Sequence, residues 1–527
     1  MTSVAVYNEY WETGGGGEMF CGGIAQALAE AGHDVTILAH RDFDVEALSE
    51  RLSLDLTGCT LATVDTGATE VAAASADYDL FVNGSYLSPV INRADHGLYV
   101  VHFPSRPWGR TPGRIAEFYR SAVGSAGITV EWGEGFHAPD GGAGTVWTSG
   151  EATILIRSDL EDDRTVDVLL GRSRPEAAGP ATVEVSTGDG VCGTVELEVA
   201  PPSFVDRVRR RLPASVPVVL PAGGYVEVTI RTPTFVPAEL GLGADSRELG
   251  VRFVGVESAP RALALAARAV PSLNHRLSHQ DATSMFLRSY DRVASNSEFT
   301  REFVESWWGI EESPVLYPPV QLREPGGEKR TSIAAVGRFF EKDAGHSKKQ
   351  LELVTAFRRL LASGVEGWTL ALVGGVDENA RGYFEEVQRA AEGLPIEFHP
   401  NASGAERDRV LSEASIFWHA TGFGEDPESA PELMEHFGIS TVEAMSSGCV
   451  PVVFAGGGQN EIVTDGAGFR WRTLDELVDA TRRLVDTPEL LERTSANAVT
   501  RSSEFGFPAF AGRLDAIVGE ILASDAG

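Results

Sequence analysis

The sequence predicts an α/β protein with two strand–helix domains facing a cleft and an antiparallel β-sandwich inserted into the first. Three observations lead to this fold class. Buried-strand patterns alternate with amphipathic helices up to about residue 126, and again from about residue 312 to 502. Between residues 127 and 257, short alternating strands separated by Gly, Pro and Asp turns replace that rhythm. The chain of 527 residues is also too long for a single core.

The predicted domain boundaries follow these changes in pattern. Strand and helix signals resume after the inserted segment, beginning with a helix expected over residues 261–270. Pro- and Gly-rich residues 311–329 are typical of a linker. The expected parts are residues 1–126 with 258–311 as the N-terminal domain, 127–257 as the β-sandwich, 312–502 as the C-terminal domain, and 503–527 as a last helix that either α/β domain can accommodate.

Two features of the N-terminal domain suggest a ligand site. The run Gly14–Gly17 follows a short strand and precedes a helix expected over residues 19–31. Such a turn can bring backbone N–H groups against a phosphate, although a flexible turn is an equal alternative. His102 follows a buried strand, where functional side chains gather in open α/β sheets, and a solvated loop histidine is the plain alternative.

Composition excludes several classes of function. The formal net charge of −32 argues against nucleic-acid binding and against broad docking on anionic lipid. No apolar run is long enough to span a bilayer, no signal-peptide pattern opens the chain, and the four cysteines lie far apart. We therefore expect a cytoplasmic protein with at most peripheral membrane contact.

The stretch from Glu435 to Glu461 combines a loop, a helix start, an apolar strand and a glycine-rich loop. This order describes a ligand site at the carboxyl edge of a parallel sheet. Glu443 has an ordinary structural explanation, because Ser440 and Glu443 have the spacing of a capping box. Glu435 has none, so it is the stronger candidate for binding a ligand.

A second candidate site follows the strand that ends at Val336. Gly337 and Arg338 come directly after it, and three of the four lysines of the chain (Lys342, Lys348 and Lys349) fall within eight residues. Lys348 and Lys349 stand at the start of a predicted helix, where a cation opposes the helix dipole. A bound anion would resolve this conflict, and a solvated basic turn is the alternative.

Taken together, these stretches resemble retaining glycosyltransferase family 4, whose members have two Rossmann-like domains in the GT-B fold. The context EHFGISTVEAMSSGCVPVV, with Glu435 and Glu443 eight residues apart, is the most specific part. The loop at 15–18, the Val336–Arg338 turn and the loop at 457–461 match in order and spacing. The variants VHFP, SNSEFT and EHFGI resemble the α-1,2-mannosyltransferases of N-glycan assembly. The resemblance covers roughly 390 residues.

The resemblance implies a role for each matching residue. Arg338 and Lys348 would neutralise the leaving diphosphate, Glu435 would hold donor-sugar hydroxyls, and His102 would contact the sugar from the facing domain. Glu443 would hold the ribose. The remaining residues expected to bind the nucleotide donor are Gly16, Gly17, Gly337, Lys349, Gly438 and Ile439. The family needs no metal or cofactor, and it reacts on one face of the sugar.

The resemblance also implies the partners: a GDP- or UDP-linked sugar as donor, and a glycan, lipid-linked or small-molecule acceptor. Two departures limit it. The spacing from Arg338 leaves Lys348 and Lys349 hard to separate, and the acidic loop at 422–434 is expanded. A sugar-nucleotide epimerase on the same fold and an inactive glycan-binding protein using the β-domain remain the alternatives.

Several further residues have weaker signals. Asp77 and Asp79 are rejected as a metal site because they precede their strand. In the inserted domain, sugar stacking is one interpretation of three aromatic residues, and binding of an anionic acceptor or lipid phosphate is one interpretation of a basic run, but a structural role is favoured for both sets. The aromatic residues are Trp132, Phe136 and Trp147, and the basic run is Arg207, Arg209, Arg210 and Arg211. Three arginines that follow His102 are the better candidates for binding an acceptor phosphate: Arg106, Arg110 and Arg114.

Overall fold

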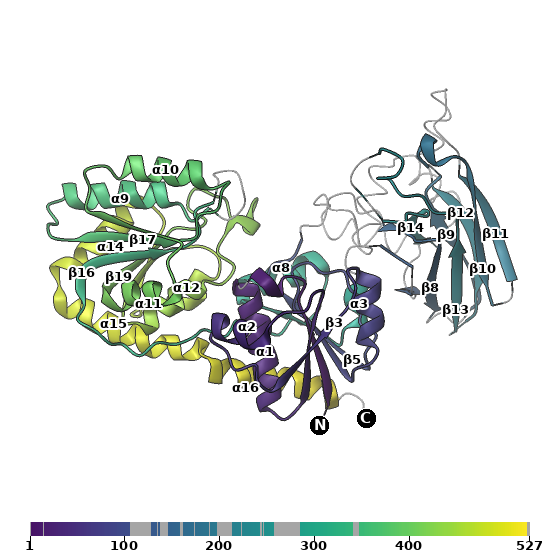
Figure 1. Ribbon diagram of the computed structural model, residues 1–527, viewed down its shortest axis with the longest axis horizontal. Coiled ribbons are helices and arrows are strands. Elements are labelled where there is room, and N and C mark those ends of the chain that lie inside the picture. The colour runs from purple at the N-terminus through teal and green to yellow at the C-terminus, as the bar shows by residue number, and fades with distance from the viewer. Residues whose placement is uncertain are drawn as a thin grey trace.

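A computed structural model of the chain describes residues 2–105 except Gly14, most of 128–257, and residues 285–340 and 347–523. Within 128–257 it leaves out 134, 138–145, 159–161, 173, 189, 198–212, 223, 243–244 and 246. It has two parallel α/β domains and an antiparallel β-domain drawn apart from them (Figure 1). The predicted fold class is confirmed: the two α/β domains form the GT-B arrangement.

The N-terminal domain has a six-stranded parallel sheet in the order β15-β5-β4-β1-β2-β3. Its core unites the strands with the apolar face of α1, including Phe20, Ile24 and Leu28. The order reverses between β1 and β4, and open parallel sheets bind ligands at such a switch point. The elements are β1 Ser3–Tyr7, α1 Gly16–Glu30, β2 Asp34–Ala39, α2 Val45–Leu52, β3 Cys59–Thr63, α3 Ala68–Ser75, β4 Leu80–Asn83, β5 His96–Val101, β15 Arg292–Ser295 and α8 Glu298–Trp308.

The C-terminal domain repeats this topology, with strand order β18-β17-β16-β19-β20-β21 and its own core. Here the order reverses between β16 and β19, so the turn after β16 and the last residue of β19 lie side by side. The elements are β16 Arg330–Val336, α9 Gln350–Ala362, β17 Thr369–Gly374, α10 Arg381–Ala390, β18 Ile396–Pro400, α11 Gly404–Glu413, β19 Ala414–His419, α12 Ile439–Ser446, β20 Val450–Phe454, α13 Gln459–Ile462, β21 Phe469–Trp471, α14 Leu474–Asp486 and α15 Pro488–Ser502.

The inserted domain packs a five-stranded sheet, β11-β10-β13-β8-β6, against a four-stranded sheet, β12-β9-β14-β7. Phe136 is buried in this core edge-on to Phe253, so it cannot stack on a sugar ring. Trp147 packs edge-on against Phe235. The strands are β6 Ile128–Trp132, β7 Val146–Trp147, β8 Glu151–Ser158, β9 Arg164–Leu170, β10 Ala181–Thr187, β11 Gly190–Leu197, β12 Ala214–Leu220, β13 Tyr225–Arg231 and β14 Arg252–Glu257.

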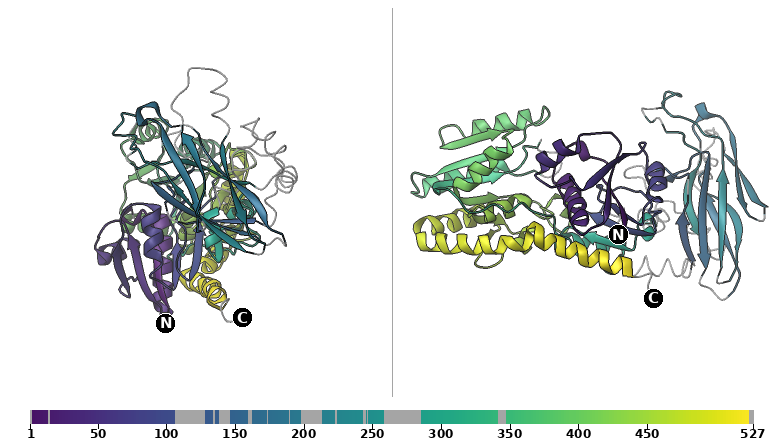
Figure 2. Two further views of the ribbon diagram at one scale, coloured as in Figure 1. Left: turned by 90° about the vertical axis from the view of Figure 1, so that its right-hand side faces the viewer. Right: turned by 60° about the horizontal axis from the view of Figure 1, so that its bottom comes forward.

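The last helix, α16 (Phe507–Ala523), packs on the N-terminal domain. Its Phe510, Leu514 and Ile521 join the core formed by α1 and the N-terminal sheet. Figure 2 shows α15 and α16 running in sequence beneath the C-terminal and then the N-terminal domain. The chain therefore crosses between the α/β domains twice, once through the linker and once through this helix.

Some predictions lie outside the described residues. They are Gly14, Lys342, the helix expected over 261–270, and the arginines named above as acceptor or lipid-phosphate candidates. Within the described residues, no helix combines the length and the apolar character that crossing a bilayer requires.

Candidate active site

A cavity of about 480 Å³ lies between the two α/β domains, at the carboxyl ends of both sheets. The C-terminal domain contributes Arg338, Lys348 and Glu435 to its wall, and the facing domain contributes Gly16 and His102. Further lining residues among those predicted are Gly337, Gly438, Ile439 and Glu443. Gly17 and Lys349 are the predicted site residues that do not line it.

Glu435 is the centre of a polar cluster in this cavity. Its Oε2 atom accepts hydrogen bonds from Lys348 Nζ at 2.6 Å and from His419 Nε2 at 2.9 Å. The side chains of Glu435, Lys348 and His419 are only 18%, 22% and 3% exposed to solvent. Both donors engage Oε2. The other carboxylate oxygen, Oε1, accepts no hydrogen bond from the described residues, which leaves it for a ligand.

The electrostatics of the cluster keep Glu435 ionised. Burial raises the pKa of Glu435, but the Lys348 charge and the His419 hydrogen bond outweigh it and hold that pKa well below its usual range. Burial lowers the pKa of His419 more than its interaction with Glu435 raises it. The cluster therefore pairs one carboxylate with one ammonium group and a neutral imidazole at neutral pH.

The structure separates the two adjacent lysines. Lys349 is the N-cap of α9 with a left-handed φ of 56°, and this turn directs consecutive side chains apart. Lys348 points to Glu435, whereas Lys349 Nζ contacts Glu425 Oε1 at 2.7 Å in the acidic loop. Two carboxylates, Glu435 and Glu425, thus offset the unfavourable position of the two lysines at this helix end. The anion predicted between Arg338, the lysines and the helix N-terminus stays a prediction.

Arg338 remains a candidate anion-binding residue. It follows β16, is exposed and lines the cavity, and its side chain has no ion pair or hydrogen bond within the described residues. A guanidinium that lacks a carboxylate partner in a chain of net charge −32 suits a dianionic ligand.

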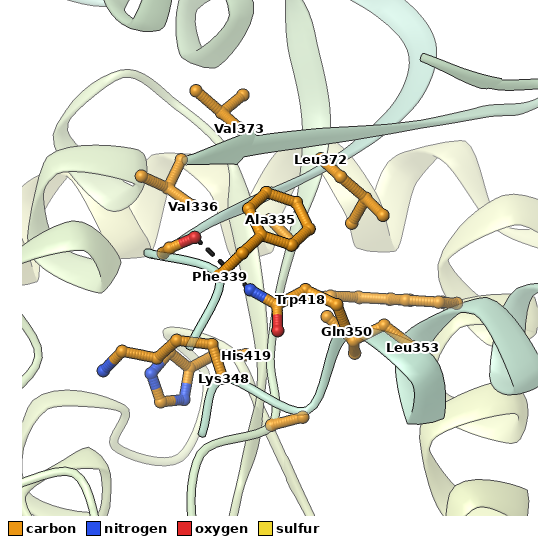
Figure 3. A pocket seen from close by; sticks show the side chains of 12 residues that line it. Ala335, Val336, Phe339, Lys348, Gln350, Leu353, Leu372, Val373, Trp418 and His419 are labelled. Atoms are coloured by element: carbon orange, nitrogen blue, oxygen red, sulfur yellow. Dashed lines mark hydrogen bonds between the residues drawn. The ribbon is translucent and has the colours of Figure 1, made fainter. Parts of the chain in front are cut away.

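Gly337 is required by the position of Lys348. A Cβ atom at residue 337 would lie 2.7 Å from Lys348 Cγ, and the Gly337 carbonyl accepts a hydrogen bond from Gln350 Nε2 at 3.3 Å. Figure 3 shows Lys348 and His419 next to one another below this turn, at the edge of a smaller, mostly apolar pocket.

Gly337→Ala should therefore displace Lys348 and weaken donor binding. We expect the Kd of the donor nucleotide to rise by roughly tenfold, since one charge-assisted contact is lost. Titration calorimetry with the nucleotide measures this. Gly382→Ala is the matched control, because a Cβ atom there meets nothing within 4 Å. An unchanged Kd would show that Lys348 does not contact the nucleotide.

The predicted capping box at Ser440 and Glu443 is wrong. The N-cap is Gly438, at a φ of 124°, two residues before Ser440, so helix α12 begins at Ile439. Glu443 is buried, and its Oε1 atom instead pairs with Arg323 Nη1 at 3.3 Å and Arg407 Nη2 at 3.5 Å. The N-terminus of α12 consequently has no side-chain cap from the described residues and faces the cavity.

The N-terminal domain presents its glycine loop and His102 to the cavity. A Cβ atom at Gly16 would lie 3.3 Å from Ile439 Cδ1, so this loop sits directly across from the start of α12. A Cβ atom at Gly17 would lie 3.6 Å from His102 Cε1, which places Gly17 behind the imidazole.

His102 is not a solvated loop residue. Its Nε2 atom lies 2.8 Å from the Gly84 carbonyl, so this nitrogen carries the proton and Nδ1 is the acceptor. Burial lowers the pKa of His102 more than the Gly84 hydrogen bond raises it. The ring is therefore neutral at pH 7, enclosed by Phe20 and Tyr86.

Several residues of the site were missed by sequence reasoning. His419 ends a buried strand, which is the same signal that singled out His102. Arg51 donates to the Trp11 and Glu12 carbonyls at 3.2 Å and 3.0 Å and so anchors the segment before the glycine loop. Asn296, within the SNSEFT stretch of the resemblance, also lines the cavity, as does Arg407, which no sequence signal marks. Within the described residues, no three His, Cys, Asp or Glu side chains are grouped to hold a metal ion.

Comparison with known proteins places the C-terminal domain in a family. Residues 324–501 match the family described as glycosyl transferases group 1. This domain belongs to that glycosyltransferase family. The matched residues contain Arg338, Lys348, Glu435 and Glu443, so most of the cavity wall on this side comes from the glycosyltransferase domain.

Curated relatives of the chain carry the name GDP-Man:Man(3)GlcNAc(2)-PP-Dol alpha-1,2-mannosyltransferase. The protein of Xenopus tropicalis is 27% identical over 186 residues, which are 32% of this chain and 34% of that protein. The protein of Homo sapiens is 25% identical over 231 residues, which are 41% of this chain and 42% of that protein. The chain thus spans well under half the length of the relatives it matches.

Solved structures share the fold of the whole chain. Sucrose-phosphate synthase from Thermosynechococcus elongatus is 13% identical with a TM-score of 0.52, covering 99% of this chain and 100% of that chain. Anabaena HepE, solved in complex with UDP and glucose, is also 13% identical, with a TM-score of 0.51 and the same coverage. At 13% sequence identity, what this chain shares with these proteins is the fold alone.

Proposed function

We propose that this protein transfers a hexosyl unit from a GDP- or UDP-linked sugar to a hydroxyl of an acceptor, with retention of configuration. One observation carries the proposal. Arg338, Lys348 and Glu435 of the glycosyltransferase domain line one cavity with Gly16 and His102 of the facing domain. Cations, a carboxylate with a free oxygen and an uncapped helix N-terminus suit the diphosphate and the sugar of such a donor.

The diphosphate is held from two sides in this proposal. Arg338 and Lys348 neutralise the charge that develops on the leaving group, which is the largest catalytic term for such a step. The N–H groups at the start of α12, after Gly438 and Ile439, add the positive end of the helix dipole. Lys349, paired with Glu425, supports this site only through the backbone turn that orients Lys348.

In this proposal Glu435 binds the donor sugar and Glu443 binds the ribose. Glu435 accepts sugar hydroxyls on Oε1, while Lys348 and His419 hold Oε2 and so fix the carboxylate. Glu443 accepts hydrogen bonds from the ribose hydroxyls, and its ion pairs with Arg323 and Arg407 orient its carboxylate. His102 offers its Nδ1 acceptor to the sugar from the opposite wall.

The reaction proceeds on one face of the sugar. The bond between the anomeric carbon and the diphosphate oxygen breaks, and a bond from that carbon to the acceptor oxygen forms. The acceptor proton passes to an oxygen of the departing phosphate, so neither a metal nor a second carboxylate is needed to balance the step.

The acceptor approaches from the N-terminal domain. Tyr86 is 50% exposed, and its ring centroid lies 6.4 Å from that of His102, so an aromatic surface borders the place where the acceptor hydroxyl must arrive. A sugar ring of a glycan, lipid-linked or small-molecule acceptor can stack there. The names of the curated relatives favour GDP-mannose as the first donor to test.

A panel of UDP-, GDP- and ADP-sugars tests the proposal. We expect one base to raise the melting temperature and its sugar to release free nucleotide faster when acceptor glycosides are added. An epimerase would interconvert the sugar without releasing nucleotide. A glycan-binding protein would show no shift with any nucleotide, and either result would overturn the proposed transfer.

A further inference from the structure

Glu461 connects the two domains beside the active-site cavity. It lies on α13 of the glycosyltransferase domain, yet its carboxylate accepts hydrogen bonds from two backbone N–H groups of α8 in the N-terminal domain. Glu298 N lies 2.8 Å from Oε2, and Phe299 N lies 3.3 Å from Oε1. A carboxylate from one domain thus caps a helix of the other.

The donors at the start of α8 show how complete this cap is. The N–H group of Thr300 is satisfied by the side chain of the N-cap residue Ser297 at 3.0 Å. The N–H groups of Glu298 and Phe299, which a helix cannot satisfy itself, are satisfied by Glu461. The negative charge also lies at the positive end of the helix dipole. The N-terminus of α8 therefore needs the other domain to complete its hydrogen bonds.

The first turn of α8 supports the acceptor side of the cavity. Asn296, immediately before the N-cap, lines the cavity, and its N–H group bonds to the Val101 carbonyl. Thr300 Oγ1 lies 3.4 Å from the His102 carbonyl. A shift of this turn relative to the glycosyltransferase domain would therefore move both His102 and Asn296.

On its own side, Glu461 is coupled to Glu435. The loop before α13 packs on the Glu435–Phe437 segment: the Gly458 N–H group donates to the Glu435 carbonyl at 2.8 Å. A Cβ atom at Gly457 would lie 2.1 Å from that same carbonyl oxygen. Arg501 Nη2 holds the Glu461 carbonyl at 2.6 Å. The backbone that carries Glu461 is thus part of the structure that positions Glu435.

A ring contact supports the same junction. Phe103, next to His102, stacks on His436, next to Glu435, with centroids 4.1 Å apart and planes 9° from parallel. Residues adjacent to the two facing site residues are therefore in direct contact across the domains. Phe103 also stacks on Phe299, whose N–H group Glu461 binds, with centroids 5.8 Å apart, so the stack and the cap are neighbours.

We propose that Glu461 is a positioning residue: its cap on α8 sets the closed spacing at which Glu435 of the glycosyltransferase domain and His102 of the N-terminal domain act on one sugar. Two domains joined by a linker and one helix need a specific contact to hold this spacing. A carboxylate that binds two backbone N–H groups fixes direction as well as distance. The kinetic consequence rests on the proposed function, whereas the effect on domain closure does not.

Glu461→Ala and Glu461→Gln, made in the full chain, test this. Without any ligand, small-angle X-ray scattering should give a larger radius of gyration for Glu461→Ala than for the wild type. With the donor identified by the panel, kcat should fall by roughly ten- to a hundredfold, because misplacement of catalytic groups by about 1 Å costs that much. The Kd of the nucleotide should change by less than about twofold, which separates positioning from binding.

Two controls make the test specific. Glu504→Ala removes a carboxylate that contacts the same Arg501 but does not reach the N-terminal domain, so scattering and kcat should remain as in the wild type. Ser297→Ala weakens α8 from within its own domain, and should lower the melting temperature without changing the scattering. Glu461→Gln keeps one acceptor oxygen and should retain more kcat than Glu461→Ala.

Unchanged scattering and a kcat within about twofold of wild type for both Glu461 variants would overturn the proposal. If Glu461→Ala does not fold, Glu461→Gln, which keeps the shape of the side chain, decides the matter by the same two measurements. If the wild type transfers no sugar, the scattering result still supports or overturns the role in closure.

Discussion

Arg338→Ala should reduce sugar transfer by about 10²- to 10³-fold in kcat while leaving the fold intact, since removing one preorganised charge at a developing anion costs that much. Arg338 is exposed and has no ion pair or side-chain hydrogen bond within the described residues, so its removal leaves no buried group unpaired. Initial rates of nucleotide release with saturating donor measure the effect, and the melting temperature reports the fold.

Arg472→Ala is the matched control for Arg338. Arg472 is an exposed arginine of the same domain that does not line the cavity, so its removal should leave the rate unchanged. Arg338→Lys should recover only part of the activity, because an ammonium group cannot make the two-pronged contact of a guanidinium with phosphate. A rate for Arg338→Ala close to that of wild type would remove Arg338 from the site.

Glu435→Gln should abolish transfer and also destabilise the protein. The substitution removes the carboxylate that accepts hydrogen bonds from the donor-sugar hydroxyls in the proposed complex. It also leaves the Lys348 ammonium buried without a counter-charge. Breaking a buried pair costs roughly 3–5 kcal/mol, and the residual exposure of both side chains places this pair at or below the lower end. Denaturant unfolding followed by tryptophan fluorescence, together with initial rates, measures both effects.

A second substitution separates the two effects. Lys348→Met in the Glu435→Gln background removes the unpaired charge, so part of the stability should return while activity stays absent. If the double variant is no more stable than Glu435→Gln, the lost pair is not the cause of the destabilisation.

The pH dependence of stability gives an independent check on Glu435. Its pKa is held well below the usual value of about 4.3, so its contribution to stability is present above that value and is lost as the pH falls through the folded-state pKa. The difference in stability between wild type and Glu435→Gln should consequently be constant from about pH 6 to 8.

Much of the fold could be predicted because it depends on local patterns. The strand Ile333–Val336 is apolar because both faces of a parallel sheet are covered, and the helix ending at Ala362 has a regular apolar face. The change to alternating strands after residue 127 marked the β-domain, because each strand of a sandwich has one covered and one exposed face. The structural role favoured for Phe136 agrees with its burial in the core of the β-domain.

The candidate site was predicted less completely. Glu435, Arg338, Lys348 and His102 were found because each follows a strand or departs from an ordinary structural explanation. The capping box at Ser440 failed because Gly438, a glycine with positive φ, is the N-cap of α12 two residues earlier. The division of labour between Lys348 and Lys349 depends on the left-handed turn at Lys349 and on where Glu425 lies in space.

By itself, the sequence determined the two α/β domains, the inserted β-domain and a ligand site at the sheet edges, because hydrophobic period and turn residues are local properties. Only the tertiary structure decided which charges meet. Glu435 meets Lys348 and His419, Glu443 meets Arg323 and Arg407, and Glu461 reaches across to α8. These pairs join residues that are 16 to 163 positions apart, and no local pattern encodes such contacts.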